Sequence, residues 1–298
     1  MSDGSATDGP VHPGPVLAVD VGGTKLAAGI VDDQGALSVA ARIDTPLGTD
    51  AERLFAALLG LIHTVVGEDE AGMPARCGVG CGGPMEHHGE LVSPLNIPAW
   101  RRFPLRARLA AELGVPVAVD NDAKALALGE GWRGAAQGTS NYLAMVVSTG
   151  VGGGIVLDGR LLEGASGNAG HIGHIVVEPD GRVCECGGRG CLEAEASGTA
   201  IAAITGRPAV EADAATIQRV GTLVGRGVAD VVTLLDLPLA VVAGSVALGY
   251  GTPFFAAANA ELAARARLDF ARGARIVPAG LGGSAPLIGA AAVARSRA

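Results

Sequence analysis

Short apolar runs that end at glycine or at an acidic residue recur along the chain, and other segments carry apolar residues at every third or fourth position. The short runs predict buried strands, and the wider spacing predicts helices that pack on a sheet. The predicted strands cover residues 16–20, 77–81, 115–120, 142–148, 155–157, 240–243 and 274–277. The predicted helices cover residues 51–66, 123–130, 200–204, 216–235, 253–267 and 287–295.

Composition narrows the fold class. Hydrophobic residues make up 49% of the 298 residues but aromatic residues only 3%, so the core must consist of Ala, Val, Leu and Ile. Together with 47 glycines, such a core favours an α/β protein with close packing of helices on sheets and many tight turns. The length suits one or two domains.

Charge and cysteine content exclude other classes. The net charge of -8 argues against a nucleic-acid-binding surface. Each apolar run is interrupted before the roughly 18 residues that a membrane-spanning helix needs. Residues 1–15 lack a basic start and an apolar segment, so we expect a disordered tail rather than a signal peptide. Five cysteines without a secretion signal indicate the reducing cytoplasm.

A glycine-rich turn near the N-terminus carries the first chemical signal. Asp20 ends an apolar run, Gly22, Gly23 and Thr24 follow, and a second apolar run extends through residue 31. This pattern predicts a β-hairpin whose turn offers backbone N–H groups and the Thr24 hydroxyl to a phosphate, while Asp20 holds Mg²⁺ through water. An ordinary glycine hairpin is the alternative.

The same plan of strand, turn and strand recurs later in the chain. Thr149, Gly150 and Gly152 lie between apolar runs at residues 142–148 and 155–157. The recurrence predicts a duplicated core, with one phosphate-binding turn of each half facing a shared cleft. Gly244 and Ser245 follow another buried strand and are candidates for contact with the sugar or base edge of a nucleotide.

Polar residues crowd the junction between a strand and a helix at residues 120–122. Asp120, Asn121 and Asp122 follow an apolar run and precede a helical segment. Capping of the helix explains one such residue but not all three. Because α/β folds place ligand sites at the carboxyl ends of strands, we expect a general base here.

Histidine and cysteine residues form a pattern typical of a metal site. His174 is followed by Cys184, Cys186 and Cys191, with glycines that let the backbone bring the four side chains together. One imidazole and three thiolates fill a tetrahedron, which predicts a structural zinc ion. A disulfide or three inert buried thiols are the alternatives, but a Cys-x-Cys pair suits bridging poorly and a cytosolic setting disfavours disulfides.

Asn96 is a polar residue among apolar neighbours, in a segment that follows a Gly-Gly-Pro loop. Its amide can donate and accept hydrogen bonds to a sugar, or it can stabilise a turn before Pro98. The sequence pattern leaves both interpretations open.

Four motifs together resemble those of the ROK family (repressors, open reading frames, sugar kinases), from residue 16 to the C-terminus. The motifs are Asp20-x-Gly-Gly-Thr-Lys25, Asn121-Asp122-Ala123, Ser148-Thr-Gly-Val-Gly-Gly-Gly154, and Gly170-His-Ile-Gly-His174 followed by Cys-x-Cys-Gly and Gly-Cys-Leu-Glu. The resemblance implies an actin/hexokinase-like ribonuclease-H fold, with two α/β domains around a deep cleft. We expect domains at residues 16–116 plus 287–298 and at residues 117–286, the second with the zinc-binding loop.

The resemblance also implies an activity: transfer of the ATP γ-phosphoryl group to a hydroxyl of a sugar, usually the 6-hydroxyl of a hexose. Asp122 would accept the hydroxyl proton, and the two turns, with Lys25 completing the first, would hold ATP and Mg²⁺. The matching positions that contact the sugar are Gly83, Asn96, Asn121, Asp122, His174 and Glu193. A homodimer or homotetramer is implied, with a hexose and ATP as the partners and no nucleic acid or membrane.

His171 departs from the pattern of family glucokinases, which carry glutamate at this position. The run around His171 is similar to that of some bacterial N-acetylmannosamine kinases. A carboxylate accepts two hydroxyl protons and a neutral imidazole one, so His171 affects the choice of sugar, with glucose as the first expectation and N-acetylmannosamine as the alternative. A sugar-responsive regulator is a further alternative, but residues 1–15 leave no room for a DNA-binding domain.

Overall fold

The computed structural model describes residues 14–46, 48–69 and 71–297. A disordered tail was expected at residues 1–15, and residues 1–13 of it lie outside the described residues. The chain divides into two compact units, Met1–Leu128 with Ser284–Ala298, and Gly129–Gly283. The prediction of two α/β domains is therefore confirmed.

The first unit contains a mixed five-stranded sheet in the order β3-β2-β1-β4-β5. Strands β1, β2 and β3 pair antiparallel, whereas β4 and β5 run parallel to β1. The strands are β1 (Val16–Val21), β2 (Lys25–Val31), β3 (Leu37–Asp44), β4 (Cys77–Cys81) and β5 (Val117–Asn121). In β1 and β4 nearly every residue is buried, which agrees with short continuous apolar runs rather than alternating ones.

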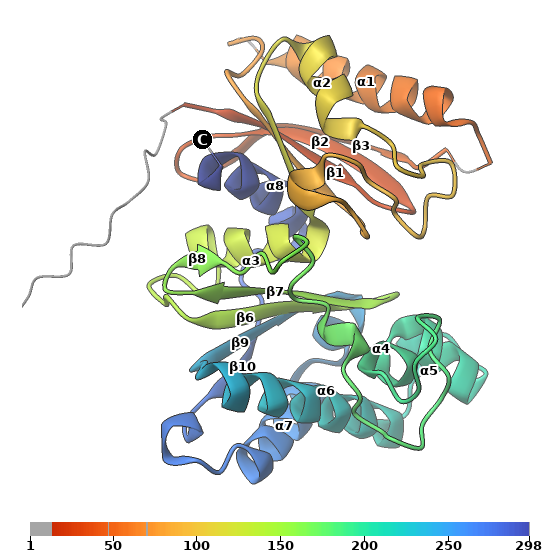
Figure 1. Cartoon of the computed structure of the whole chain (residues 1–298), viewed down its shortest axis with the longest axis vertical. Helices are drawn as coiled ribbons and strands as arrows, with labels where there is room; N and C mark the ends of the chain where they lie inside the picture. The colour runs from red at the N-terminus through yellow and green to blue at the C-terminus, as the bar shows by residue number, and fades with distance from the viewer. Residues whose placement is uncertain (1–13, 47, 70, 298) are drawn as a thin grey trace, which may run out of the picture. The chain divides into compact units, whose positions relative to one another are not determined.

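Helices cover both faces of the first sheet (Figure 1). Helices α1 (Ala51–Glu68) and α2 (Leu105–Leu113) lie on one face, and α8 (Ala285–Ser296) lies on the other. Helix α3 (Asp122–Arg133) begins directly after β5. The Asp50 side chain caps α1 by accepting a hydrogen bond from the Arg53 N–H at 2.8 Å. Helix α8 thus returns the end of the chain to the sheet that its beginning forms.

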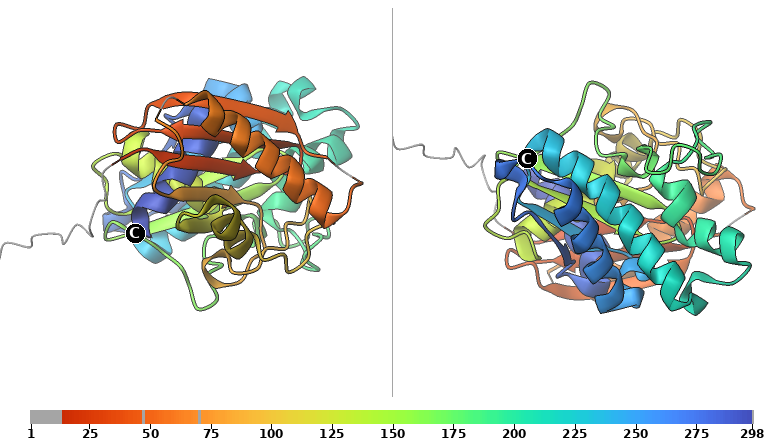
Figure 2. Two further views of the ribbon diagram at one scale, coloured as in Figure 1. Left: turned by 90° about the horizontal axis from the view of Figure 1, so that it is seen from above. Right: turned by 90° about the horizontal axis from the view of Figure 1, so that it is seen from below.

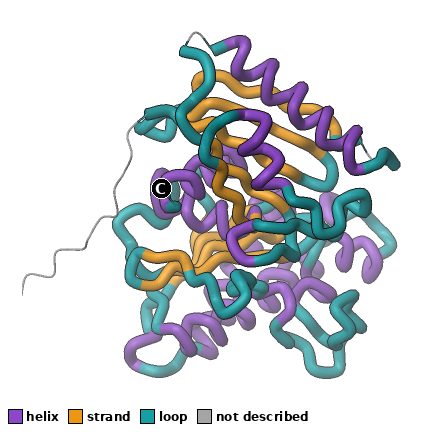
Figure 3. The backbone as a smooth tube through the Cα atoms, turned by 45° about the horizontal axis from the view of Figure 1, so that its top comes forward, coloured by secondary structure: helices purple, strands orange, loops and turns teal. Residues whose placement is uncertain are grey.

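The second unit repeats the strand order of the first. Its sheet has the order β10-β9-β6-β7-β8, with β6, β7 and β8 antiparallel and β9 and β10 parallel to β6. The strands are β6 (Tyr142–Val147), β7 (Val151–Leu157), β8 (Arg160–Leu161), β9 (Leu239–Ala243) and β10 (Arg275–Pro278). Figure 3 shows the strands of the chain in orange among the purple helices. The predicted duplication of the core is confirmed by this matching topology.

Two long helices pack side by side against the second sheet. They are α6 (Ala214–Leu235) and α7 (Ser245–Arg265), and the right-hand view of Figure 2 shows them adjacent along much of their length. Two short helices, α4 (Leu192–Ala196) and α5 (Gly198–Thr205), follow the cysteine-rich loop. Each unit has its own cluster of buried apolar side chains, so each has a separate hydrophobic core.

Three features differ from the sequence-based expectations. Helix α7 begins at Ser245 instead of residue 253, with a kink where Gly251 has a positive φ of 59°. Elements β3 and α2 were not expected, although half-buried residues alternate with exposed ones in the first part of β3 and the buried Leu105, Leu109 and Leu113 of α2 recur at helical spacing. We expected the domain boundary at residue 117, which would place β5 in the second domain. In the structure, β5 pairs with β4 of the first unit, and the division between the two units falls inside α3.

Among the described residues, none of the helices combines the length and the apolar character that crossing a membrane requires.

Candidate functional site

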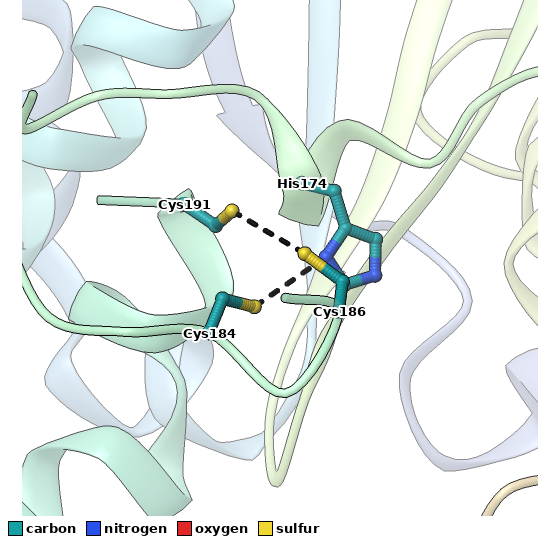
Figure 4. A group of neighbouring side chains, drawn as sticks. All are labelled: His174, Cys184, Cys186 and Cys191. Carbon is teal, nitrogen blue, oxygen red and sulfur yellow. Dashed lines mark hydrogen bonds between the residues drawn. The ribbon is translucent and has the colours of Figure 1, made fainter. Parts of the chain in front are cut away.

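The four expected metal ligands lie together in the second unit (Figure 4). His174 lies in a short 3₁₀ turn (Ile172–His174), Cys184 and Cys186 lie in the following loop, and Cys191 directly precedes α4. Their ligand atoms all lie within 4.8 Å of one another. The loop folds tightly because the Cys184 N–H donates to the Gly188 carbonyl at 2.8 Å and the Gly187 N–H donates to the Cys184 carbonyl at 2.9 Å.

The spacing of these atoms fits a tetrahedral metal ion. Nδ1 of His174 lies 3.7 Å from Sγ of Cys184, and the Sγ atoms of Cys186 and Cys191 are also 3.7 Å apart. Ligand atoms bonded to one tetrahedral zinc lie roughly 3.5–3.8 Å from each other. All five cysteines are free, and 3.7 Å between the sulfurs of Cys186 and Cys191 is far longer than the ~2.05 Å of a disulfide. The donor set therefore fits zinc in a closed, structural site.

The three thiols of the cluster differ in acidity. Burial, followed by the hydrogen bonds with Cys186 and Cys184, raises the pKa of Cys191 to about 12. Burial likewise raises the pKa of Cys184, whereas the hydrogen bond with the Gly188 backbone, followed by that with Cys184, lowers the pKa of Cys186. A bound cation would favour the thiolate form of all three cysteines.

The loop that carries the histidines packs on the start of β7. Gly173 leaves no space for a side chain, because a Cβ there would lie 2.2 Å from the Val151 carbonyl oxygen. His171 is exposed, and its ring centroid lies 6.0 Å from that of His174. The structure therefore brings both histidines next to the glycine-rich turn between β6 and β7.

Glu193 connects the metal cluster to this turn. It lies in the first turn of α4, two residues after Cys191, and its Oε2 accepts a hydrogen bond from the Val151 N–H at 2.8 Å. A Cβ on Gly150 would lie 2.8 Å from the same oxygen. The carboxylate thus rests directly against the turn that contains Thr149 and Gly150.

Other segments of the second unit hold the turn as well. The Ser148 carbonyl accepts from the Gly198 N–H at 2.7 Å, and the Thr149 carbonyl accepts from the Thr199 hydroxyl at 3.0 Å. The hydroxyls of Ser148 and Ser245 are hydrogen-bonded at 2.9 Å. The second unit therefore gathers most of the residues expected there: Thr149, Gly150, Gly152, His171, His174, Glu193, Gly244 and Ser245.

In the first unit, the carboxyl ends of three neighbouring strands align. Asp20 of β1 is in register with Gly80 of β4, which is in register with Asp120 of β5. Asp122 follows at the N-terminus of α3, and the Asp122 Cα lies 3.8 Å from the position that a Cβ on Gly80 would take. Because Gly80 has no side chain, Asp20 and Asp122 face each other across it.

This alignment perturbs the acidic groups. Burial and the nearby charge of Asp122 raise the pKa of Asp20 to about 7. Burial, Asp122 and Asp20 also raise the pKa of the Cys81 thiol. Two close carboxylates in a desolvated position are a donor set that suits Mg²⁺.

The first glycine turn lies beside Asn96. A Cβ on Gly23 would lie 2.5 Å from the Asn96 Cβ, so the two backbones approach closely. The Thr45 hydroxyl donates to the Gly22 carbonyl at 2.7 Å and supports the turn. The Gly83 carbonyl accepts from the Leu95 N–H at 3.1 Å, which places Gly83 near the Asn96 segment. Thr24 and Lys25 are exposed at the start of β2.

Sequence reasoning assigned no role to the buried Lys124 and Glu130 or to the half-buried Arg297. Lys124 and Glu130 are 2% and 0% exposed, and Glu130 accepts hydrogen bonds from the N–H groups of Ala135, Gly280 and Leu281. Arg297 forms an ion pair with Asp120. The sequence does carry a signal for Lys124, because it is a charged residue inside the apolar run of α3. The pairing of Arg297 with Asp120 depends on the tertiary structure and leaves no such signal.

Comparison with known proteins gives a consistent result. The family model described as "ROK family" matches residues 16–297. A glucokinase of Thermotoga maritima is 39% identical over 188 residues, which cover 62% of this chain and only 58% of that protein. An N-acetylmannosamine kinase of Citrobacter koseri is 37% identical over 252 residues, which cover 79% of this chain and 84% of the relative.

A solved structure supports the same assignment. The crystal structure of a ROK family glucokinase from Streptomyces griseus, in complex with glucose and AMPPNP, superposes with a TM-score of 0.80 at 31% identity. The superposition covers 95% of this chain and 99% of that chain. The predicted actin/hexokinase-like fold is confirmed by this similarity.

Proposed function

The chain belongs to the ROK family, and from this premise we propose that it is an ATP-dependent sugar kinase. The observation that carries the proposal is the placement of Asp122. Its carboxylate lies at the end of β5, opposite Asp20, in the unit that also holds the first glycine turn. The reaction we propose is transfer of the γ-phosphoryl group of ATP to the 6-hydroxyl of a hexose.

The proposed chemistry requires a base, a phosphate site and charge neutralisation. Asp122 accepts the proton of the sugar hydroxyl as the bond to phosphorus forms. The turns that contain Gly22, Gly23, Thr24 and Lys25, and Thr149, Gly150 and Gly152, offer N–H and hydroxyl donors to the phosphates. Mg²⁺ held through Asp20 would neutralise charge on the transferred group. Gly244 and Ser245 contact the nucleoside of ATP.

The residues that we propose to hydrogen-bond to the sugar are Gly83, through its backbone, and Asn96, Asn121, His171, His174 and Glu193. Nδ1 of His174 faces the cysteine cluster, so Nε2 is the nitrogen available to a hydroxyl. Zinc would then fix the orientation of His174 from the opposite side of the ring.

Substitution of Asp122 by Asn tests the role of the base. We expect Asp122→Asn to reduce kcat by at least about a hundredfold, because a general base contributes roughly 10²–10⁴. Sugar binding, measured by calorimetry, should remain. Asp158→Asn, at a turn of the second unit, is a matched control that should turn over normally. Turnover of Asp122→Asn at the wild-type rate would exclude Asp122 as the base.

Glucose is the substrate that we propose first, and N-acetylmannosamine is the alternative that His171 and the Citrobacter koseri relative favour. A coupled assay of ADP release on glucose, mannose, N-acetylmannosamine and N-acetylglucosamine distinguishes them. His171→Glu should then raise kcat/KM for glucose relative to N-acetylmannosamine, because a carboxylate accepts two hydroxyl protons. Replacing ATP by polyphosphate in the same assay tests the phosphoryl donor. The cytoplasmic location and the homodimer or homotetramer remain predictions.

A further inference from the structure

A buried ion cluster is formed by residues on either side of the proposed catalytic base in the sequence. Asp120 and Lys124 are each only 2% exposed, and Nζ of Lys124 lies 3.3 Å from Oδ1 of Asp120. Arg297, which follows α8, forms an ion pair with Oδ2 of the same carboxylate. Two cations from distant parts of the chain therefore converge on one acidic side chain.

The cluster is bonded to the backbone that carries the base. Oδ1 of Asp120 accepts the Asn121 N–H at 2.8 Å, and Nη1 of Arg297 donates to the Val119 carbonyl at 2.9 Å. These two hydrogen bonds fix the backbone of residues 119–121, at the end of β5. Since Asp122 is the next residue, its position depends on this short segment.

We propose that Arg297, acting through Asp120, is a positioning residue that fixes the Asn121–Asp122 junction. This inference rests on the proposed function, because it assigns a second residue to the same base. Arg297 does not touch the substrate in this scheme. A simpler role, fastening the end of α8, makes different predictions.

The surroundings of Arg297 allow it to be replaced by a shorter side chain without steric conflict. The residue lines a cavity of about 320 Å³ together with Arg76, Cys77 and Ala118, so a shorter side chain leaves space that water can enter. Arg295, in the last turn of α8, offers a matched control, because it pairs with Asp33 instead. Both arginines tie the end of the chain to the first unit, but only Arg297 of the two reaches the segment before Asp122.

The experiment compares Arg297→Gln, Arg297→Lys and Arg295→Gln with the wild type under conditions where circular dichroism shows each to be folded. We expect Arg297→Gln to lower kcat on the order of 10- to 100-fold, since misplacement of a reacting group by about 1 Å costs that much. The dissociation constant of the sugar should change much less than kcat.

The remaining variants separate positioning from simple stabilisation. Arg297→Lys keeps a cation that can pair with Asp120 and should restore part of kcat, whereas Arg295→Gln should lower Tm without changing kcat. If the wild type is active and the folded Arg297→Gln variant has the same kcat, this inference alone is overturned. A wild type without activity on any sugar of the panel removes the proposed function and this inference with it.

Discussion

The Glu193 carboxylate accepts a hydrogen bond from the Val151 N–H at 2.8 Å. Glu193 lies two residues after Cys191, the last residue of the candidate metal-binding cluster. One side chain thereby joins the cysteine-rich loop to the turn that begins β7. Because Cys191 and Glu193 lie in the same helical turn, displacement of the cysteine should displace the carboxylate. The cluster of His174 and the three cysteines is thus structurally linked to the proposed phosphate turn.

Removal of the Glu193 carboxylate should weaken nucleotide binding as well as sugar binding. The bond to Val151 is a hydrogen bond to a charged acceptor, and such bonds contribute about 1.5–3 kcal/mol. We therefore expect Glu193→Ala to raise the KM for ATP about tenfold, in addition to its effect on the sugar. Glu193→Gln retains an acceptor and should affect mainly the sugar. Glu185→Ala, an exposed change in the same loop, should alter neither KM.

Loss of one cysteine ligand should release the metal and destabilise the second unit. We expect Cys186→Ser to reduce metal affinity at least about 10- to 100-fold, since even partners outside the ligand set contribute that much. Metal analysis and thermal unfolding of the purified protein measure both effects. Cys77→Ala removes a buried thiol outside the cluster and should leave the metal content unchanged. Wild-type protein without metal under reducing conditions would contradict the zinc assignment.

Ionisation of Asp20 should lower the free energy of unfolding as the pH rises. Its pKa is raised from 3.8 to about 7 in the folded protein, so between these values the folded state binds more protons than the unfolded state. The contribution of Asp20 to stability is therefore fully present below about pH 4 and is lost as the pH approaches 7.

The comparison of wild type with Asp20→Asn isolates this effect from other carboxylates. The asparagine side chain of this variant does not titrate. The stability of Asp20→Asn relative to wild type should therefore increase from about pH 4.5 to about pH 7.5, by one or more kcal/mol on the scale of about 1.4 kcal/mol for each unit of pKa. Urea unfolding at several pH values measures it. A difference that does not change with pH would show that Asp20 titrates normally.

A side chain at Gly78 should disrupt the packing of α8 on β4. A Cβ there would lie 1.9 Å from the Ala290 carbonyl oxygen, which is backbone and cannot rotate away. We expect Gly78→Ala to lower the free energy of unfolding by about 3 kcal/mol or more, as in overpacked cores. Gly60→Ala is the control, because Gly60 is exposed in α1 with open space at its Cβ and should gain about 0.5–1 kcal/mol.

The sequence predicts the local elements of the site well, because each depends on neighbouring residues. The hairpins around Gly22 and Gly150 follow from apolar runs interrupted by glycines, and both appear as β1–β2 and β6–β7. The spacing of His174 and the three cysteines depends on one loop, and their ligand atoms do converge. Short-range patterns of this kind need no knowledge of the tertiary structure.

Contacts between segments that are distant in the sequence cannot be predicted in this way. The register of Asp20 with Gly80 and Asp120 depends on the order of strands in the sheet, which periodicity does not encode. The pairing of Arg297 with Asp120 joins residues separated by 177 positions. From the sequence alone, Arg297 is one more charged residue after the predicted apolar helix at residues 287–295.

The return of α8 to the first sheet also has a consequence for synthesis of the protein on the ribosome. The second unit is a continuous stretch of chain, whereas the first unit lacks α8 until Ala285–Ser296 has been translated. Until then, apolar side chains of the first sheet that α8 covers remain in contact with water. We expect this nascent state to bind chaperones that recognise exposed apolar surface.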